Sequence, residues 1–436
     1  MKVTFSSKIS LSYCVVVCSI ITLLFSGFIK NFLSPSFLNL GTLLVDLLIV
    51  FQLIHIILVF TFFYIYGRKI DREYLLIAAF WAFLLLLTLG KIFFVDENSI
   101  KERISGLRNN LFYCLPVIYI PLLFQKERYI SRSIHILLGA GLILCLYAIF
   151  QYTFASSLPL SFLAPKGEGA FMFYQQEIIR PTALVGNTII FASLTLFLFC
   201  LVFTKYITHK KKVYLLFLCL ILTANILTFT RATMIGFFLS GSVILVLYYG
   251  RFTLLYTIKL FAITSILLSV LLVLGFQYKD TFIVKRLTGR EASTISSNEG
   301  HFSMIDNSII YLKKHYLAGS GVGSQGPSGD PENVIITDGY WFQMFLENGV
   351  PLGILYLLFY VFCLLYALQV LFKTNSILLK QLCLAFLGVS VYFYAASFIN
   401  SAFIGRVNFI LYWILFGLIM ALRLITKRNP NAVLSH

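Results

Sequence analysis

Hydrophobic residues fill this chain in long uninterrupted runs, and polar residues are largely confined to the segments between them. Each run holds roughly 17–25 residues, the length that an α-helix needs to cross the hydrocarbon core of a bilayer. The runs are continuous rather than alternating, so they do not fit the strands of a membrane β-barrel. They predict about twelve transmembrane helices. We place these at residues 11–29, 41–66, 73–94, 109–124, 134–153, 188–204, 213–229, 232–249, 256–275, 350–372, 377–399 and 405–423.

The predicted fold is therefore an all-α polytopic membrane protein in three parts. Residues 1–275 hold the first nine helices, with a medium loop at 154–187, and residues 350–436 hold the last three and a short tail. Between them lies a large loop, 276–349. Two prolines, Pro116 and Pro121, are expected to break or kink the fourth helix.

The large loop is expected to be partly helical. Residues 301–316 place Phe302, Ile305, Ile309 and Leu312 at helical spacing. A glycine-rich segment follows, and then a short aromatic helix, DGYWFQMFLENG, leads into the tenth span. Its aromatic residues are of the kind that lie at the lipid–water boundary. These are Tyr340, Trp341 and Phe345.

Composition agrees with a membrane protein and limits its partners. Hydrophobic residues make up 59% of the chain and charged residues 12%, and a soluble protein of 436 residues cannot bury so much apolar surface. The net charge of +17 is concentrated in short loops, with no long basic face for nucleic acid. The positive-inside rule places both termini in the cytoplasm and the loops at 154–187 and 276–349 outside.

One arginine, Arg231, interrupts the apolar stretch CLILTANILTFTRATMIGFFLSG. A charge within a membrane segment is expensive unless it has a partner or a function. The loop charges place Arg231 in a four-residue outer turn, where its guanidinium could bind a diphosphate whose lipid tail stays in the bilayer. The alternative is a side chain that reaches toward head groups or pairs with an acid, which is the interpretation we favour for Arg286 and Arg290.

Further candidates lie on the same predicted side of the membrane: Arg180, His301 and Asp338. Asp338 precedes the aromatic helix, so it either caps that helix or orients and deprotonates a sugar hydroxyl. The segment 319–326, GSGVGSQG, is either a phosphate-binding nest or a flexible hinge. The sequence contains no metal-ligand set, nucleotide motif or Ser–His–acid set. Any reaction should therefore use a donor that already carries its leaving group, with no cofactor.

Four motifs resemble those of the O-antigen ligase and O-antigen polymerase superfamily. The stretch LTFTRATMIGF resembles its T-x-S/T-R turn, and RPTALVGNTIIFA resembles its R-x-x-G-x-x-x-N segment. The stretch YLKKHYLAGSGVGSQGP resembles its L-x-G-x-G segment. The stretch DGYWFQMFLENGVPLG resembles its last motif, x-N-x-Y-L-Q-x-x-x-E-x-G-x-x-G. All four occur in the family's order across residues 180–353, and the number of spans agrees as well.

The resemblance implies metal-independent glycosyl transfer at the outer face of a bacterial cytoplasmic membrane. The donor is a glycan linked to polyprenyl diphosphate, and the partners are an acceptor glycan, membrane lipids and a chain-length regulator. Arg180 and Arg231 correspond to residues that bind the diphosphate. Asn187, at the end of the second motif, and Arg290 join them as candidates for substrate binding.

Ligases of this superfamily carry a histidine at the start of the last motif, where this chain has Asp338 followed by glycine. That difference favours a polymerase of lipid-linked repeat units over a ligase. Asp338, and after it His301 or Glu177, would assist the acceptor hydroxyl. A transporter or flippase would instead place ionisable residues at mid-depth in the membrane. A scaffold protein would not require arginines at these positions.

Overall fold

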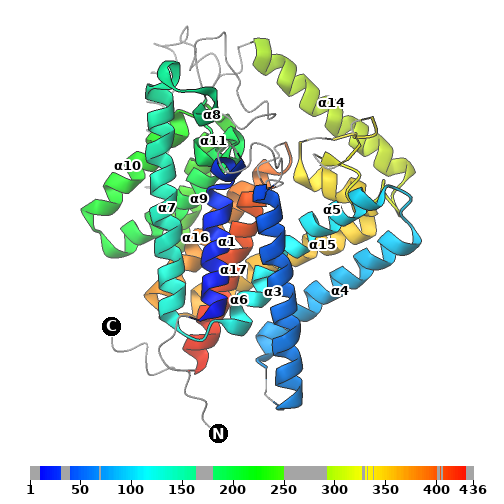
Figure 1. The fold of residues 1–436 in the computed structure, drawn as a ribbon, viewed down its shortest axis with the longest axis horizontal. Helices are drawn as coiled ribbons and strands as arrows, with labels where there is room; N and C mark the ends of the chain where they lie inside the picture. The colour runs from blue at the N-terminus through cyan, green and yellow to red at the C-terminus, as the bar shows by residue number, and fades with distance from the viewer. Residues whose placement is uncertain are drawn as a thin grey trace.

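The structure, a computed structural model, describes residues 10–30, 40–67, 70–163, 180–249, 292–326, 329–330, 332–336, 338–399, 403 and 406–428. Within these residues every regular element is a helix (Figure 1). The α-helices are α1 (Leu11–Leu24), α2 (Ser26–Phe28), α3 (Leu40–Ile65), α4 (Arg72–Phe94), α5 (Ile100–Asn110), α6 (Pro116–Leu123), α7 (Glu127–Thr153), α8 (Leu160–Leu163), α9 (Thr188–His209), α10 (Lys212–Ile226), α11 (Arg231–Tyr249), α14 (Ala292–Lys314), α15 (Tyr340–Lys373), α16 (Ile377–Ala396) and α17 (Arg406–Arg428). The 3-10 helices are η2 (Phe112–Cys114), η3 (Ala155–Ser157) and η4 (Ala183–Val185).

Most of the expected spans are present as helices. In the described part of the chain, 8 helices are long and apolar enough to cross a membrane, namely α3, α4, α7, α9, α11, α15, α16 and α17. Helices α1 and α10 are apolar but shorter. The expected span at 256–275 lies outside the described residues, as does much of the loop at 154–187. The prediction of an all-α, multi-pass membrane protein is confirmed.

The fourth expected span is broken at Pro116, as predicted, whereas Pro121 lies within α6 and does not end it. It consists of η2 followed by α6, which is only 8 residues long. Pro116 is the first residue of α6. Proline has no backbone N–H, so it can begin a helix but cannot continue one from the preceding turn.

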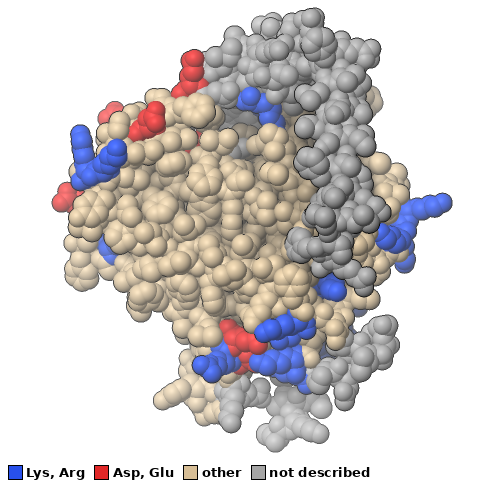
Figure 2. Space-filling model, turned by 180° about the vertical axis from the view of Figure 1, so that it is seen from behind, with Lys and Arg blue, Asp and Glu red and all other residues tan. Residues whose placement is uncertain are grey.

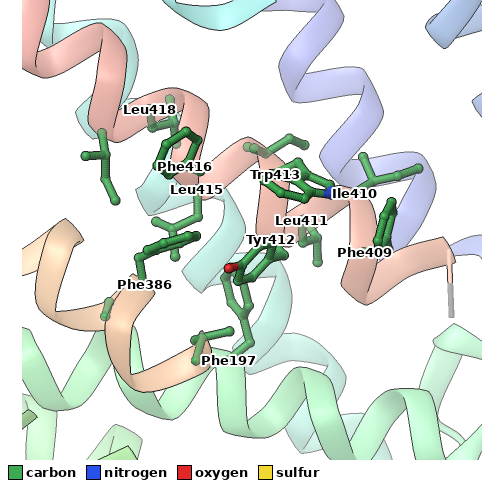
Figure 3. Close-up of a cluster of buried hydrophobic side chains, with 14 of the residues drawn as sticks. Phe197, Phe386, Phe409, Ile410, Leu411, Tyr412, Trp413, Leu415, Phe416 and Leu418 are labelled. Atoms are coloured by element: carbon green, nitrogen blue, oxygen red, sulfur yellow. The ribbon is translucent and has the colours of Figure 1, made fainter. Parts of the chain in front are cut away.

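The centre of the bundle is formed by α9 and α17. In each of them, 83% of the most apolar window is buried inside the protein, against 22% for α3. Figure 3 shows the core around α17, where Tyr412 and Phe416 pack against Phe386 of α16 with ring centroids 4.7 and 5.2 Å apart. Phe197 of α9 lies in the same cluster. A helix as little buried as α3 must present most of its surface to lipid.

Loops far apart in the sequence meet at one end of the bundle, where α9, α11, α15 and α17 begin. Asn408 of α17 donates to the carbonyl of Ile190 in α9 at 3.1 Å, and the amide of Trp341 in α15 donates to the carbonyl of Ser397 at 3.2 Å. Helices α5 and α14 lie near this end, toward the top of Figure 1. We call it the arginine end, because Arg180, Arg231 and Arg406 lie there. The loops at this end are those expected to be extracytoplasmic. The side of the membrane that they face stays a prediction.

The opposite end carries a separate charged cluster. Lys427 of α17 pairs with Asp71 at 3.0 Å and with Glu73 at 3.3 Å, and Asp71 also caps α4. Figure 2 shows a broad surface with few charged side chains between the two ends. That distribution is what a membrane-spanning protein requires, since charges are costly at mid-depth.

Two features of the large loop differ from the prediction. The expected helix is present as α14, but the exposed fractions of Phe302 and Ile309 are 65% and 40%, while Ser308 is buried. Tyr340 and Trp341 do not lie at the lipid–water boundary, because both are buried. They pack against Tyr360, further along α15, with ring centroids 6.1 and 5.4 Å away. Apolar spacing predicts a helix, but it does not show which face its neighbours will cover.

Candidate functional site

The turn between α10 and α11 is as short as the sequence predicted. Helix α10 ends at Ile226 and α11 begins at Arg231. Between them, Phe229 adopts a left-handed backbone conformation with φ of 51°, which is rare for a bulky residue. Such a conformation costs about 1–3 kcal/mol and persists only where the surroundings impose it. The turn is therefore held in place by its neighbours.

Arg180 is one of those neighbours. Its Nε donates to the carbonyl of Thr228 at 2.7 Å, and its Nη2 donates to the hydroxyl of Thr230 at 3.0 Å. Only 6% of Arg180 is exposed. The two arginines of the predicted site thus meet at one turn, as expected, but at least two donors of Arg180 bind the protein rather than a ligand. The structure makes Arg180 a residue that positions the Arg231 turn.

A buried asparagine that the sequence analysis missed supports the same turn from below. The Nδ2 of Asn225 donates to the carbonyl of Ala192 at 3.2 Å and to the hydroxyl of Thr195 at 2.8 Å, both on α9. It also lies 3.0 Å from the hydroxyl of Thr233 on α11. The sequence feature that could have indicated this role is a single asparagine within an apolar run, because such a side chain must find hydrogen-bond partners inside a membrane protein.

Arg231 is the first residue of α11 and is partly exposed. The N-terminus of a helix carries a partial positive charge and free backbone N–H groups, so it attracts anions and disfavours cations. A guanidinium placed there adds to the positive potential rather than balancing it. This combination is unfavourable for stability and favourable for binding a phosphate group.

Asn187 has a structural role in the segment that carries Arg180. Its side-chain oxygen accepts hydrogen bonds from the amides of Ile189 and Ile190 at 2.9 and 3.1 Å and so caps α9. The cap follows Gly186, which has a φ of 92°. The role of Asn187 in substrate binding stays a prediction.

His301 and Asp338 come together although 37 positions separate them in the sequence. The Nδ1 of His301 in α14 lies 3.7 Å from the Oδ2 of Asp338, and the two side chains are 29% and 31% exposed. This separation exceeds a hydrogen bond, and a small rotation of either side chain would close it. The N-cap of α15 is Gly339, without a side-chain cap. Asp338 is therefore not the N-cap of α15, and the acid–base role of the pair stays a prediction.

The glycine-rich segment 319–326 is neither a hinge nor an open phosphate nest. The amide of Val322 donates to Asp96 at 3.0 Å, and that of Gly326 donates to the carbonyl of Ile336 at 3.1 Å. A Cβ on Gly323, whose φ is 80°, would lie 2.0 Å from the carbonyl oxygen of Glu102 in α5. The segment is packed tightly against α5, a helix that the hydropathy pattern did not predict and that begins with a capping box.

The glycine-rich segment lies beside a carboxylate of the chain itself, that of Glu347. Glu347 of α15 is buried, and its carboxylate accepts hydrogen bonds from Asn110 at 3.0 Å and Gln343 at 2.8 Å. Gln343 also donates to the carbonyl of Gln325 at 3.3 Å, which ties the glycine-rich segment to the same group of side chains. The last motif thus fixes the glycine-rich segment, α5 and α15 to one another. A buried carboxylate needs several donors of this kind to be stable.

Three residues considered as candidates lie outside the described part of the chain: Glu177, Arg286 and Arg290. The structure does not bear on their roles.

A comparison with known families agrees with this site. Residues 213–357, a third of the chain, match a family model described as O-antigen ligase. The matched region contains the Arg231 turn, the His301–Asp338 pair and Glu347, whereas Arg180 and the Asn110 that donates to Glu347 precede it. No curated protein matches the chain significantly. This match over residues 213–357 supports the resemblance to the O-antigen ligase and polymerase superfamily, and the apolar helices of the described residues indicate a multi-pass membrane protein.

Proposed function

We propose that this protein polymerises polyprenyl diphosphate-linked glycan repeat units at the outer face of the cytoplasmic membrane. The observation that carries the proposal is the placement of Arg231. It opens α11 in a strained turn that Arg180 and Asn225 hold in one geometry. The family match supports a reaction of the O-antigen ligase and polymerase type.

The arginine turn would bind the donor. When the glycan leaves its lipid carrier, negative charge develops on the departing diphosphate. A guanidinium at a helix N-terminus stabilises such charge, and it does so most effectively when it is already oriented before the reaction. Arg180 contributes by fixing the turn, so a small displacement of Arg231 is expected to reduce the rate strongly.

The His301–Asp338 pair would act on the acceptor. A hydroxyl oxygen at the non-reducing end of the incoming repeat attacks the anomeric carbon of the donor glycan. The bond from that carbon to the phosphate oxygen breaks, and its electrons leave with the polyprenyl diphosphate. His301 takes the hydroxyl proton, and Asp338 stabilises the resulting imidazolium. The donor carries its own leaving group, so this scheme requires no metal or nucleotide.

A ligase is the second candidate. Asp338 occupies the position where the resemblance places a ligase histidine, which favours polymerisation. The side chain of His301, on α14, nevertheless lies beside Asp338. An imidazole is thus available to either reaction, and the identity of the acceptor distinguishes them.

The test is to profile glycans in a strain that lacks this protein. We expect single repeats on the final acceptor. Full-length polymer that accumulates on the lipid carrier would indicate a ligase, and an unchanged profile would refute both functions. Complementation with Arg231→Ala should fail at normal protein levels. The matched control is Arg132→Ala, which removes an exposed arginine of α7 near the opposite end and should restore long chains.

A further inference from the structure

A second charged cluster lies at the arginine end, between α3, α5 and η2. The Nη1 of Arg108 lies 2.8 Å from one carboxylate oxygen of Asp46, and the hydroxyl of Tyr113 donates to the other at 3.1 Å. The Arg108 guanidinium also lies 5.7 Å from the centre of the Tyr113 ring. Both oxygens of the Asp46 carboxylate are therefore engaged.

A second basic group, Arg406, lies beside this cluster on α17. Arg406 is the first residue of that helix, and α17 packs against η2, the short helix that carries Tyr113. The Nη1 of Arg406 is completely buried, and no described residue accepts a hydrogen bond from it. The cluster as described thus sets two guanidinium groups against one carboxylate. A buried guanidinium N–H without an acceptor is unfavourable, and an anion that supplied an oxygen there would stabilise it.

The surroundings of the cluster indicate which anion. The side chains of Arg108 and Asp46 are 29% and 27% exposed, so a ligand can reach them. Asp46 lies six residues into α3, about 9 Å from the start of that helix, and α3 is the least buried of the spans in the described part of the chain. A ligand bound here would place its charged group near the arginine end of α3 and its tail in the lipid beside that helix. This arrangement suits a lipid-linked phosphate better than a soluble one.

The cluster is distinct from the Arg231 turn but structurally connected to it. The turn joins α10 and α11, whereas the cluster is built by α3, α5, η2 and α17. Asn408, two residues after Arg406, donates to the carbonyl of Ile190, which lies in the first turn of α9 that Asn187 caps. Two groups of arginines are thus held at one end of the bundle by a shared framework.

We propose that Arg406, with Arg108 and Tyr113, binds the diphosphate of the second lipid-linked substrate, the acceptor, while the Arg231 turn binds that of the donor. This inference rests on the proposed polymerase function, which requires two lipid diphosphates at the same time. In the proposed arrangement, Asp46 orients Arg108 and Tyr113, and the buried Nη1 of Arg406 supplies the donor that the ligand completes.

The experiment is a binding titration of the full-length protein in detergent, with farnesyl diphosphate as the probe and native mass spectrometry as the readout. We expect the wild type to bind two equivalents and Arg406→Gln to bind one, with affinity at the lost site reduced at least tenfold. Lys101→Gln, which removes an exposed charge from α5 without touching the cluster, should retain both. Arg231→Ala should lose the other equivalent, and the double variant should lose both.

Two results would overturn the inference. One is binding of two equivalents by Arg406→Gln with wild-type affinity. The other is displacement of the probe from this site by phosphatidylglycerol at comparable concentration, which would indicate a head-group site. If Arg406→Gln does not fold, Tyr113→Phe tests the same site and should weaken one equivalent. A wild type that binds one equivalent, lost only in Arg231→Ala, refutes the second site and leaves the proposed function intact. Two equivalents that both survive Arg231→Ala count against the donor site instead.

Discussion

The strongest test of the site is to separate two roles for Arg180, as a ligand of the diphosphate and as the support of the Arg231 turn. The structure assigns the second role through the bonds to Thr228 and Thr230. Replacing Arg180 with lysine keeps the positive charge but cannot reproduce a fork with two directed donors. If Arg180 acts only as a positive charge that binds the diphosphate, lysine should replace it. If Arg180 holds the Arg231 turn, lysine should not.

The expected size of the effect follows from those two bonds. A hydrogen bond from a charged donor contributes about 1.5–3 kcal/mol, so the pair is comparable to or larger than the strain of about 1–3 kcal/mol expected for the left-handed Phe229. Once Arg180 is replaced, the turn is expected to relax and to move Arg231. A displacement of about 1 Å can reduce catalysis by about a hundredfold, and we expect a loss of that order for Arg180→Lys.

The assay is polymerisation of a purified lipid-linked repeat by wild type, Arg180→Lys, Thr230→Val and the double variant. Thr230→Val keeps the side-chain shape and removes the hydroxyl that Arg180 contacts. Both single changes break the same hydrogen bond, between Arg180 and Thr230. The double variant should therefore lose less activity than the product of the two single losses. Near-normal activity of Arg180→Lys, or fully multiplicative losses, would refute a supporting role. Size-exclusion profiles must match throughout.

Three further predictions concern the acceptor pair and the packed loop. His301→Gln should reduce turnover of the same lipid-linked repeat about 10²–10⁴-fold, and Asp338→Asn should reduce it less. Equal activity of the wild type and His301→Gln would exclude His301 as the general base. Glu347→Gln should lower the thermal midpoint, because it replaces a buried carboxylate that accepts hydrogen bonds from Asn110 and Gln343. An unchanged midpoint in a fluorescence melt would contradict that network. Gly349→Ala should yield aggregated protein on size exclusion, because Gly349 has a φ of 74° and an added Cβ would lie 2.2 Å from a backbone oxygen. The control is Gly139→Ala, which should remain monodisperse because an added Cβ there would meet no atom within 4 Å.

Much of the membrane architecture could be predicted because hydropathy is a local property. A run long enough to span a bilayer is visible in the sequence, and so is Pro116, at which the fourth span breaks. The short turn before Arg231 followed from the same pattern. The buried face of α14 and the burial of Tyr340 and Trp341 could not be predicted, because they depend on which helices pack against those segments.

The chemistry divides in the same way. The sequence by itself determined a polytopic membrane protein with arginines concentrated in the segments between its spans, because residue type and order are enough to fix which groups can enter lipid. Only the tertiary structure decided what those groups do. It showed that Arg180 donates to the Arg231 turn, that Glu347 is buried beside the glycine-rich segment, that His301 lies near Asp338, and that α17, which begins at Arg406, packs against η2. The reason is physical: a hydrogen bond or an ion pair depends on distances of a few ångströms between helices, and no local pattern records them.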